Sequence, residues 1–465
     1  MTHAWALSAA ALSSAYGRGE LSPVEVLEAV HQRIGACEPQ LNALYRADRE
    51  AALAQARAAE ARWHAGAPRS ALDGVPVTLK ENIHTRGDPA PIGTRANEGA
   101  PPQPVDAPPA ARLREAGCVL IGKTTMPDFG MLSSGVSSLH GVTRNPWRLD
   151  RNPSGSSSGA AAAAAARYGP LHVGTDIGGS LRLPATHCGI FALKPSLGRV
   201  PIYPPYLGRA AGPMTRTVED AALLMNALTG PDVRDYMALP YEPRDYRAAA
   251  HAPIPKGTRI ALLADIGAGL AVDPQVRAAA QEAATALAAA GCMVELLPPF
   301  MTEALFDGVC RFLEARSYYE LTSLPPERQA LVLPFVAEWC TWRASAFSGR
   351  DVMQAYTRLV ELRETAVRAT ADYDFLVSPT SPILPYAAEL PAPTADPRNA
   401  LPHIAFTVAW NMSEQPAASL NWSASGEGLP IGVQVVGRRF DDAGVLALCR
   451  LLEDLRPAQR PWPLN

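Results

Sequence analysis

A serine that follows two adjacent glycines is the side chain best suited to chemistry in this chain. The segment Gly174-Thr-Asp-Ile-Gly-Gly-Ser180 comes directly after an apolar stretch. Adjacent glycines allow a turn in which several backbone N–H groups converge, because no Cβ blocks the approach. Such donors stabilise developing negative charge, and a hydroxyl beside them is placed as acyl transfer requires. The alternative is a Gly-Gly turn with an incidental serine.

A nucleophilic serine needs a base, and the use of lysine in this chain is informative. Only four of the 42 basic residues are lysine, at positions 80, 123, 194 and 256. A chain that uses arginine for most positive charges can keep lysine where the group has to lose its proton, which a guanidinium does not do. Codon bias is the alternative explanation. None of the nine histidines has a spacing that nominates it, and His172 and His187 are expected to be core or surface residues.

A second serine-rich loop, Pro153-Ser-Gly-Ser-Ser-Ser-Gly159, lies upstream of Ser180. It contains a Gly-x-Ser-x-Gly match centred on Ser157, which is the pattern of the nucleophile elbow in α/β-hydrolases. That elbow should follow an apolar strand. Residues 143–153 are instead polar and interrupted by prolines, so the elbow interpretation fails its structural requirement.

Composition narrows the class of protein. Apolar residues make up 48% of the 465 residues and charged residues 19%, which predicts a large buried core. The net charge of −3 comes without a basic stripe, which argues against a nucleic-acid partner.

Seven widely spaced cysteines predict buried thiols in a reducing compartment, and the apolar start of the chain lacks the basic residues of a signal peptide, so a cytoplasmic location is expected. The longest apolar run, 159–166, is too short to span a bilayer.

Short apolar segments alternate with helical ones from Gly74 onward, which predicts an α/β layered fold. Strands are expected at 75–79, 119–121, 171–174 and 375–377. Helices are expected to begin at the Ser22 capping box, near residue 49 and at Ser348. We expect one domain over residues 1–465, with a helical segment 1–66, a central part 67–200 and a remainder 201–465.

Residues 259–297 give the clearest local prediction. A strand leads to Asp273 as N-cap and Pro274, a helix runs to Gly291, and a second strand follows. This pattern is a βαβ crossover, so part of the sheet is parallel. Segments 417–421 and 431–436 flank a glycine-bearing turn and predict an antiparallel hairpin. The sheet should therefore be mixed.

Taken together, these motifs resemble the amidase signature family over nearly the whole chain. The matching segments are 74–82, Gly122-Lys-Thr with Phe129, Asn145-Pro-Trp147, 153–162, 174–184, 189–199, 375–382 and 428–437. The resemblance implies an α/β/α fold with a large mixed, mostly parallel central sheet covered by helices on both faces. It also implies amide hydrolysis through a covalent acyl-enzyme, with no metal and no organic cofactor.

The resemblance assigns roles by position. Ser180 is the expected nucleophile, Ser156 the bridging serine, preceded by a cis peptide, and Lys80 the base. The expected oxyanion hole consists of the N–H groups of Ile177, Gly178, Gly179 and Ser180, and Asp176 and Arg182 are expected to brace this turn. An ammonium ordinarily titrates near about 10.4, so burial has to lower the pKa of Lys80 if it is to act as a base. Lys123 and Lys194 are expected to make structural hydrogen bonds and Lys256 to be solvated.

The serine-glycine loop departs from the family pattern, because Ser154 and Ser158 stand where glycine is usual. Gly155 is kept, so the cis peptide before Ser156 remains the expectation. We expect Ser157 to be structural and to help cap a helix over residues 160–167.

The substrate is less defined than the chemistry. By resemblance the acyl-binding wall includes Gly130, Met131 and Leu132. The variable region adds aromatic residues that either line the cleft or belong to the core: Phe306, Phe312, Tyr318, Tyr319, Trp339 and Trp342. If some line the cleft, the substrate is a small apolar or aryl amide, and the same chemistry would serve a carbamate or an ester.

Two other functions fit the same signature. One is the glutamine-hydrolysing subunit of a tRNA-dependent amidotransferase, which would need partner subunits and a polar pocket. The other is an inactive scaffold that keeps the fold, against which the retention of all three triad residues argues. For the favoured enzyme the expected partner is a small-molecule amide, with a possible homodimer and neither nucleic acid nor membrane.

Overall fold

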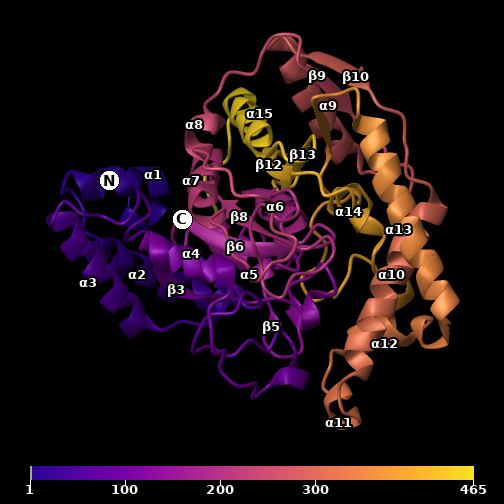
Figure 1. Cartoon of the computed structure of the whole chain (residues 1–465), viewed down its shortest axis with the longest axis horizontal. Helices are drawn as coiled ribbons and strands as arrows, with labels where there is room; N and C mark the ends of the chain where they lie inside the picture. Colours follow the sequence, from indigo (N-terminus) through magenta and orange to yellow (C-terminus); the bar gives the residue numbers. More distant parts are fainter. Residues whose placement is uncertain (1–2, 465) are drawn as a thin grey trace.

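A central sheet of 11 strands organises the computed structural model, which describes residues 3–464 (Figure 1). Its strand order is β1-β3-β2-β6-β8-β7-β12-β13-β11-β9-β10. The strands are β1 (Leu44–Arg46), β2 (Pro76–Lys80), β3 (Val119–Thr124), β6 (Leu171–Asp176), β7 (Phe191–Lys194), β8 (Ala210–Thr215), β9 (Arg259–Leu262), β10 (Met293–Leu296), β11 (Phe375–Pro379), β12 (Ala417–Ala424) and β13 (Pro430–Gly437). A separate small hairpin pairs β4 (Val136–Ser137) with β5 (Gly141–Val142).

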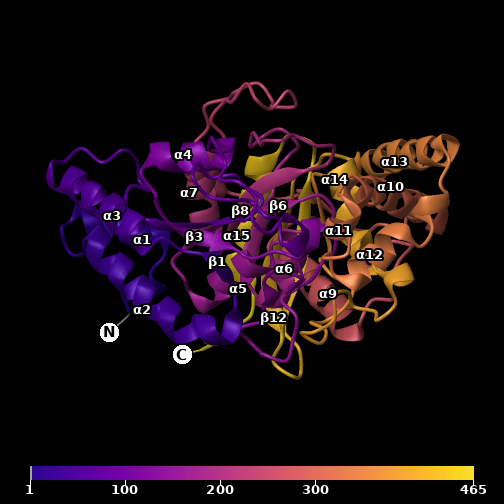
Figure 2. The same cartoon turned by 90° about the horizontal axis from the view of Figure 1, so that it is seen from below.

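Helices cover both faces and both ends of this sheet. They are α1 (Ala9–Gly17), α2 (Pro23–Leu41), α3 (Arg49–His64), α4 (Pro108–Ala116), α5 (Ser158–Ala166), α6 (Arg182–Cys188), α7 (Val218–Leu228), α8 (Tyr246–Ala250), α9 (Pro274–Ala289), α10 (Glu303–Thr322), α11 (Pro326–Gln329), α12 (Pro334–Thr341), α13 (Gly349–Thr370), α14 (Ala405–Met412) and α15 (Asp442–Leu455). Helices α7, α9 and α15 pack on one face, and α5 and α6 on the other. Figures 1 and 2 show α1–α3 at one end and α10, α12 and α13 at the opposite end.

The sheet is mixed, as the sequence predicts. Parallel pairing joins β3, β2 and β6 on one flank and β11, β9 and β10 on the other. The strands between these flanks pair antiparallel, and so does the edge strand β1. Parallel pairing is therefore confined to the two flanks of the sheet. Between them, β12 and β13 are joined by a short turn, which allows only antiparallel pairing of these two strands.

The predicted local elements are present. The strand-helix-strand unit is β9, α9 and β10, with Asp273 capping the helix. Ser22 and Ser348 each form a capping box at the start of a helix. All seven cysteines are buried and unpaired, in agreement with the expected free thiols.

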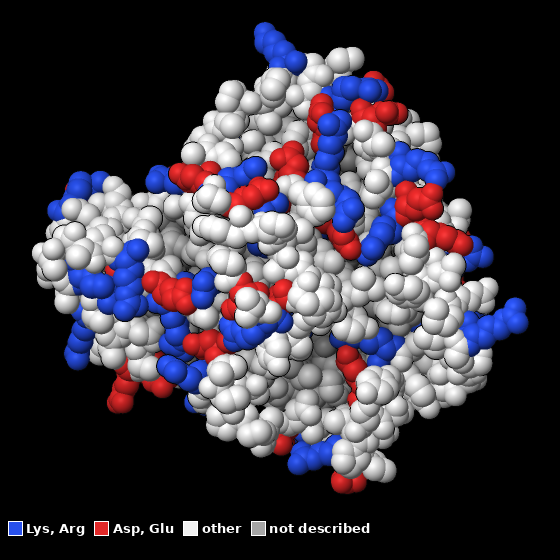
Figure 3. Space-filling view, in the orientation of Figure 1, with Lys and Arg blue, Asp and Glu red and all other residues white. Residues whose placement is uncertain are grey.

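The surface carries mixed charge. On the face shown in Figure 3, acidic and basic side chains are interspersed. Within residues 3–464, no helix combines the length and apolar character needed to cross a bilayer.

Candidate active site

The candidate base and the candidate nucleophile lie at the same edge of the sheet. Strands β2 and β6 run parallel, and Lys80 and Asp176 are their last residues. Parallel strands bring their carboxyl ends to one edge, where ligands of α/β proteins usually bind. Alternation along β2 turns Val77 and Leu79 toward the main apolar core, so Lys80 points to the opposite face, where α5 packs.

Lys80 is completely buried and contacts two hydroxyls. Its Nζ lies 2.8 Å from Oγ of Ser156 and 3.2 Å from Oγ1 of Thr175. Burial lowers the pKa of Lys80 well below its usual value, and the nearby Arg209 guanidinium lowers it further, against the opposing effect of Asp176 and Glu81. A neutral amine in this position can accept the Ser156 proton.

The loop before α5 presents Ser156 to Lys80. The Gly155–Ser156 peptide is cis, as the resemblance implies. Gly155 is required by close packing, since a Cβ there would lie 2.5 Å from the backbone oxygen of Ser134. Gly130 faces the loop, and its missing side chain leaves room for the Ser156 hydroxyl, which a Cβ would approach to 3.1 Å.

The prediction for Ser157 needs correction. It occupies the N-cap position of α5, but its hydroxyl makes no capping hydrogen bond. The hydroxyl instead donates to the Thr175 carbonyl at 3.2 Å, and the backbone N–H of Ser157 donates to the Ser180 carbonyl at 3.2 Å. These two hydrogen bonds tie the serine loop to the end of β6 and to the turn that follows. The Ser157 hydroxyl does not cap α5 because it is engaged by Thr175 instead. The helix also begins earlier than expected, at Ser158.

An internal ion pair braces the turn that carries Ser180, as predicted. The Asp176 carboxylate accepts hydrogen bonds from the N–H groups of Gly179 at 2.8 Å and Leu181 at 3.0 Å. Arg182 donates to both carboxylate oxygens, each at 3.0 Å, and neither side chain is exposed. Burial alone would raise the pKa of Asp176, but Arg182 and the hydrogen bonds outweigh it and hold the pKa below its usual value.

This brace divides the expected oxyanion donors. The N–H of Gly179 is engaged by Asp176. The N–H groups of Ile177, Gly178 and Ser180 meet no acceptor among the described residues. Three donors beside the Ser180 hydroxyl thus remain available to an oxygen of a bound molecule.

Ser180 stands where two cavities meet. The larger cavity, of about 520 Å³, also contains Ser156 in its wall, whereas the smaller, of about 40 Å³, does not. Within residues 3–464 no hydrogen bond joins the two serine hydroxyls directly, although both face the larger cavity. Catalytic hydrogen bonds are often completed only when substrate binds.

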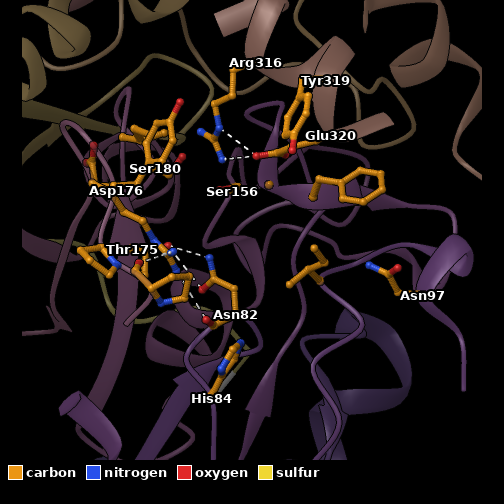
Figure 4. A pocket seen from close by; sticks show the side chains of 18 of the residues that line it. Asn82, His84, Asn97, Ser156, Thr175, Asp176, Ser180, Arg316, Tyr319 and Glu320 are labelled. Atoms are coloured by element: carbon orange, nitrogen blue, oxygen red, sulfur yellow. Dashed lines mark hydrogen bonds and ion pairs between the residues drawn. The ribbon is translucent and has the colours of Figure 1, made fainter. Parts of the chain in front are cut away.

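The two cavities differ in character. Most side chains around the smaller one are apolar: Phe129, Met131, Leu132, Ile177, Leu313, Trp339, Leu401 and Ile404. Arg316, Ser133 and Ser317 also line it. In the larger one Arg316, Tyr319 and Glu320 project from α10 on one side, while Asn82, His84 and Thr175 line the other (Figure 4). Ser180 therefore lies between a small, mainly apolar recess and a larger chamber that mixes polar and apolar side chains.

The three residues predicted for the acyl-binding wall line the cavities, and their role in binding stays a prediction. Gly130 lines both cavities, and Met131 and Leu132 line the smaller one. Of the six aromatic candidates, Tyr319 lines the larger cavity and Trp339 the smaller, while Phe306 is buried in the core around α10.

The remaining lysines and the histidines also follow expectation. Lys123 donates to the carbonyl of Ile83, and Lys194 to that of Pro195 at 2.9 Å. Burial lowers the pKa of Lys123 and Lys194 to about 7. Lys256 is exposed. His172 and His187 are buried side chains in the core, and burial lowers their pKa values to about 3 and about 4.

Several pocket residues escape sequence reasoning. Thr175 contacts Lys80 and also accepts a hydrogen bond from Asn82 at 3.1 Å. Both residues lie inside segments that match the family, 74–82 and 174–184, and that membership is the signal that could have found them. Arg209, Arg316 and Glu320 come from segments with no motif, and only the fold brings them to the cavity.

Replacing Arg182 with methionine should lower the free energy of unfolding by about 3–5 kcal/mol, because it leaves the Asp176 carboxylate buried and unpaired. Thermal or urea unfolding would measure this effect. The matched control is Arg368→Met, which breaks the exposed pair with Glu364 and should cost less than about 1 kcal/mol. Equal effects of the two variants would contradict the bracing role.

The fold and this site define the class to which the chain belongs. The Amidase family model matches residues 25–446, so the chain belongs to the amidase family and is an amide hydrolase. A glutamyl-tRNA(Gln) amidotransferase subunit from Chloroflexus aggregans is 36% identical over 96% of this chain and 96% of that protein. An acylamidase of Rhodococcus erythropolis is 33% identical, with 97% and 96% covered.

Solved structures give the same result. A bacterial aryl acylamidase of the amidase signature family superimposes with a TM-score of 0.89 at 27% identity, with 97% of this chain and 96% of that chain covered. The peptide amidase of Stenotrophomonas maltophilia gives a TM-score of 0.83 at 27% identity, with 98% of each chain covered. The predicted fold class is thereby confirmed.

Proposed function

We propose that this chain hydrolyses the C–N bond of a small amide with an apolar acyl group, through a covalent acyl-enzyme on Ser180. The observation that carries the proposal is the fully buried Lys80 amine 2.8 Å from Ser156, with Ser180 on the same cavity wall. The chemistry would proceed with Lys80 as base and Ser156 as proton relay.

In the first half of the reaction Ser180 Oγ attacks the amide carbonyl. Its proton passes to Ser156, whose own proton moves to the neutral Lys80. The carbonyl oxygen becomes an oxyanion and accepts hydrogen bonds from the N–H groups of Ile177, Gly178 and Ser180. When the C–N bond breaks, the proton returns from Lys80 through Ser156 to the leaving amine. Water then repeats the cycle on the acyl-enzyme and releases a carboxylic acid.

The dimensions of the smaller cavity support a short apolar acyl group. A volume of 40 Å³ accommodates about three water-sized groups. An amide, carbamate or ester with such an acyl group would fit the same donors. We further propose a cytoplasmic site of action, supported by the seven unpaired cysteines.

A substrate panel tests this proposal. Wild-type enzyme should hydrolyse short-chain anilides, short aliphatic amides or carbamates with a kcat/KM at least about tenfold above that for glutamine, because glutamine would place a charged head group near an apolar recess. A fluorophosphonate should label Ser180, as read by mass spectrometry. Absence of labelling together with absence of turnover would refute the proposed chemistry.

A second candidate is glutamine hydrolysis within an amidotransferase, which is favoured by the 34–36% identity to several amidotransferase subunits. In that function the recess beside Trp339 would hold the head group of glutamine, and Arg316 is the charged side chain that lines it. Glutaminase activity that appears only with added partner subunits would support this candidate over the first.

A further inference from the structure

The larger cavity contains a guanidinium with no carboxylate partner. Arg209 lines it and donates to the carbonyl oxygens of Pro204 at 3.1 Å and Asn82 at 3.5 Å. Among residues 3–464 no ion pair includes Arg209. Each carbonyl is neutral and accepts one hydrogen bond, so most of the five N–H donors of the guanidinium stay open. Burial lowers the pKa of Arg209 to about 10, nearby Arg316 lowers it further, and Glu320 opposes both without contacting Arg209 directly.

The other charges around the cavity are already balanced. Arg316 pairs with Glu320 at 2.8 Å and lies over the Tyr206 ring at 4.3 Å. The Asp176 carboxylate forms its buried ion pair with Arg182. Burial lowers the pKa of His84 and that of Lys80, which favours the neutral form of each. Among the charged residues that line the chamber within residues 3–464, Arg209 is therefore the one without a directly contacting carboxylate, and it shares this chamber with Ser180.

The orientation of a substrate follows from the relay. The leaving nitrogen has to receive its proton from Ser156, which lines only the larger cavity. The substituent on that nitrogen must then extend into the larger cavity, and the acyl group into the apolar recess. Arg209 consequently faces the amine side of the scissile bond.

We propose that Arg209 binds a carboxylate on the leaving amine, so that the preferred substrate is an amide with a short apolar acyl group and an anionic amine portion. The inference rests on the proposed function and names the substrate class of the same site. Hydrolysis would add water across the C–N bond and release a short carboxylate and an amino acid or aminoaryl carboxylate. A planar guanidinium with free donors is well matched to a carboxylate, which it can bind through two parallel hydrogen bonds.

Two aryl amides that differ in one group test the proposal. The pair is para-acetamidobenzoate and para-methylacetanilide, which have similar shape and differ by a carboxylate. Wild-type enzyme should favour the anion by about tenfold or more in kcat/KM, mainly through KM, because a hydrogen-bonded charge contributes about 1.5–3 kcal/mol. Arg209→Met should bring the ratio close to one, and Arg209→Lys should restore part of it. A change in Lys80 affects both substrates alike and leaves the ratio unchanged.

A third variant tests the charge balance from the other side. Glu320→Gln removes the partner of Arg316 and should increase the preference for the anion. A wild-type ratio near one, or a ratio that Arg209→Met leaves intact, would overturn the inference. Melting temperatures show whether each variant is folded.

Binding separates failure of this inference from failure of the proposed function. In a Ser180→Ala background, calorimetry should show para-acetamidobenzoate binding at least about tenfold more tightly than para-methylacetanilide, and Arg209→Met should abolish the difference. If the wild type hydrolyses neither amide while this preference holds, the carboxylate site stands and the proposed hydrolysis fails. Equal binding of the two compounds refutes the site whatever the activity.

Discussion

Ser180→Ala is expected to reduce kcat by about 10⁴-fold or more and to abolish fluorophosphonate labelling. The side chain supplies the oxygen that forms the acyl-enzyme, and neither Ser156 nor Thr175 can take over, because both contact Lys80 and not the free donors of the turn. Loss of a nucleophile that acts within a relay typically removes most of the rate enhancement. Steady-state kinetics with a short-chain anilide and mass spectrometry of the labelled protein would measure the two effects.

Ser158→Ala is the matched control for this variant. Ser158 is a buried serine of the same loop region, but its hydroxyl makes only a 3.5 Å contact to the Thr125 carbonyl. Its turnover should stay within about threefold of the wild type, since that contact lies at the limit of a hydrogen bond. Retention of labelling in Ser180→Ala, or an equal loss in Ser158→Ala, would show that the nucleophile has been assigned to the wrong serine.

Lys80→Met should reduce kcat by about 10³-fold or more, because Lys80 is the only hydrogen-bond partner of the Ser156 hydroxyl within residues 3–464 and therefore the group placed to accept its proton. Lys123→Met is a suitable control. Lys123 is also buried, and its pKa is also lowered, but it pairs in register with Leu79 and so lies on the opposite face of the sheet. Kinetics of both variants with one neutral anilide should separate a specific base from a general effect of burying lysine. Similar losses in the two would contradict the role of Lys80.

The pH profile provides an independent check on Lys80. The neutral amine is the active form, so kcat/KM should stay constant as the pH falls through the ordinary range of lysine titration and should decline only when the pH passes through the lowered pKa. Arg209→Met removes a positive neighbour that helps to lower this pKa, so it should move the acid limb to higher pH. An acid limb already centred near the ordinary lysine value would rule out a desolvated base.

Local elements were predictable because their signals lie within a few residues. Capping boxes at Ser22 and Ser348, the crossover at 259–297 and the C-terminal hairpin all appear as expected. The hydroxyl of Ser157 shows the limit of such reasoning. Its position before α5 predicts a cap, but a contact to Thr175, which lies 18 residues along the chain, satisfies it instead. A competing partner that arrives through the fold leaves no trace in the local pattern.

The cavity walls depended still more on the fold. Arg209 follows a loop before β8, and Arg316 and Glu320 lie on α10, more than a hundred residues later. Nothing in their spacing indicates that they share a chamber, since side chains that meet across a cavity need no common periodicity. For the same reason the sequence left open whether the aromatic residues of the variable region line the cleft or belong to the core. The structure places Trp339 at the smaller cavity.

The sequence by itself determined the family, the mixed α/β sheet and the three side chains nominated for catalysis. These follow from residue types, because a tight turn needs glycine, a nucleophile needs a hydroxyl and a base that loses its proton has to be lysine and not arginine. Only the tertiary structure decided that Lys80 is fully buried beside Ser156, that Asp176 accepts a hydrogen bond from one of the expected oxyanion donors, and that Arg209 lines the chamber without an ion pair to any of residues 3–464. Desolvation and charge balance are sums over all neighbours in space, and a linear pattern does not contain them.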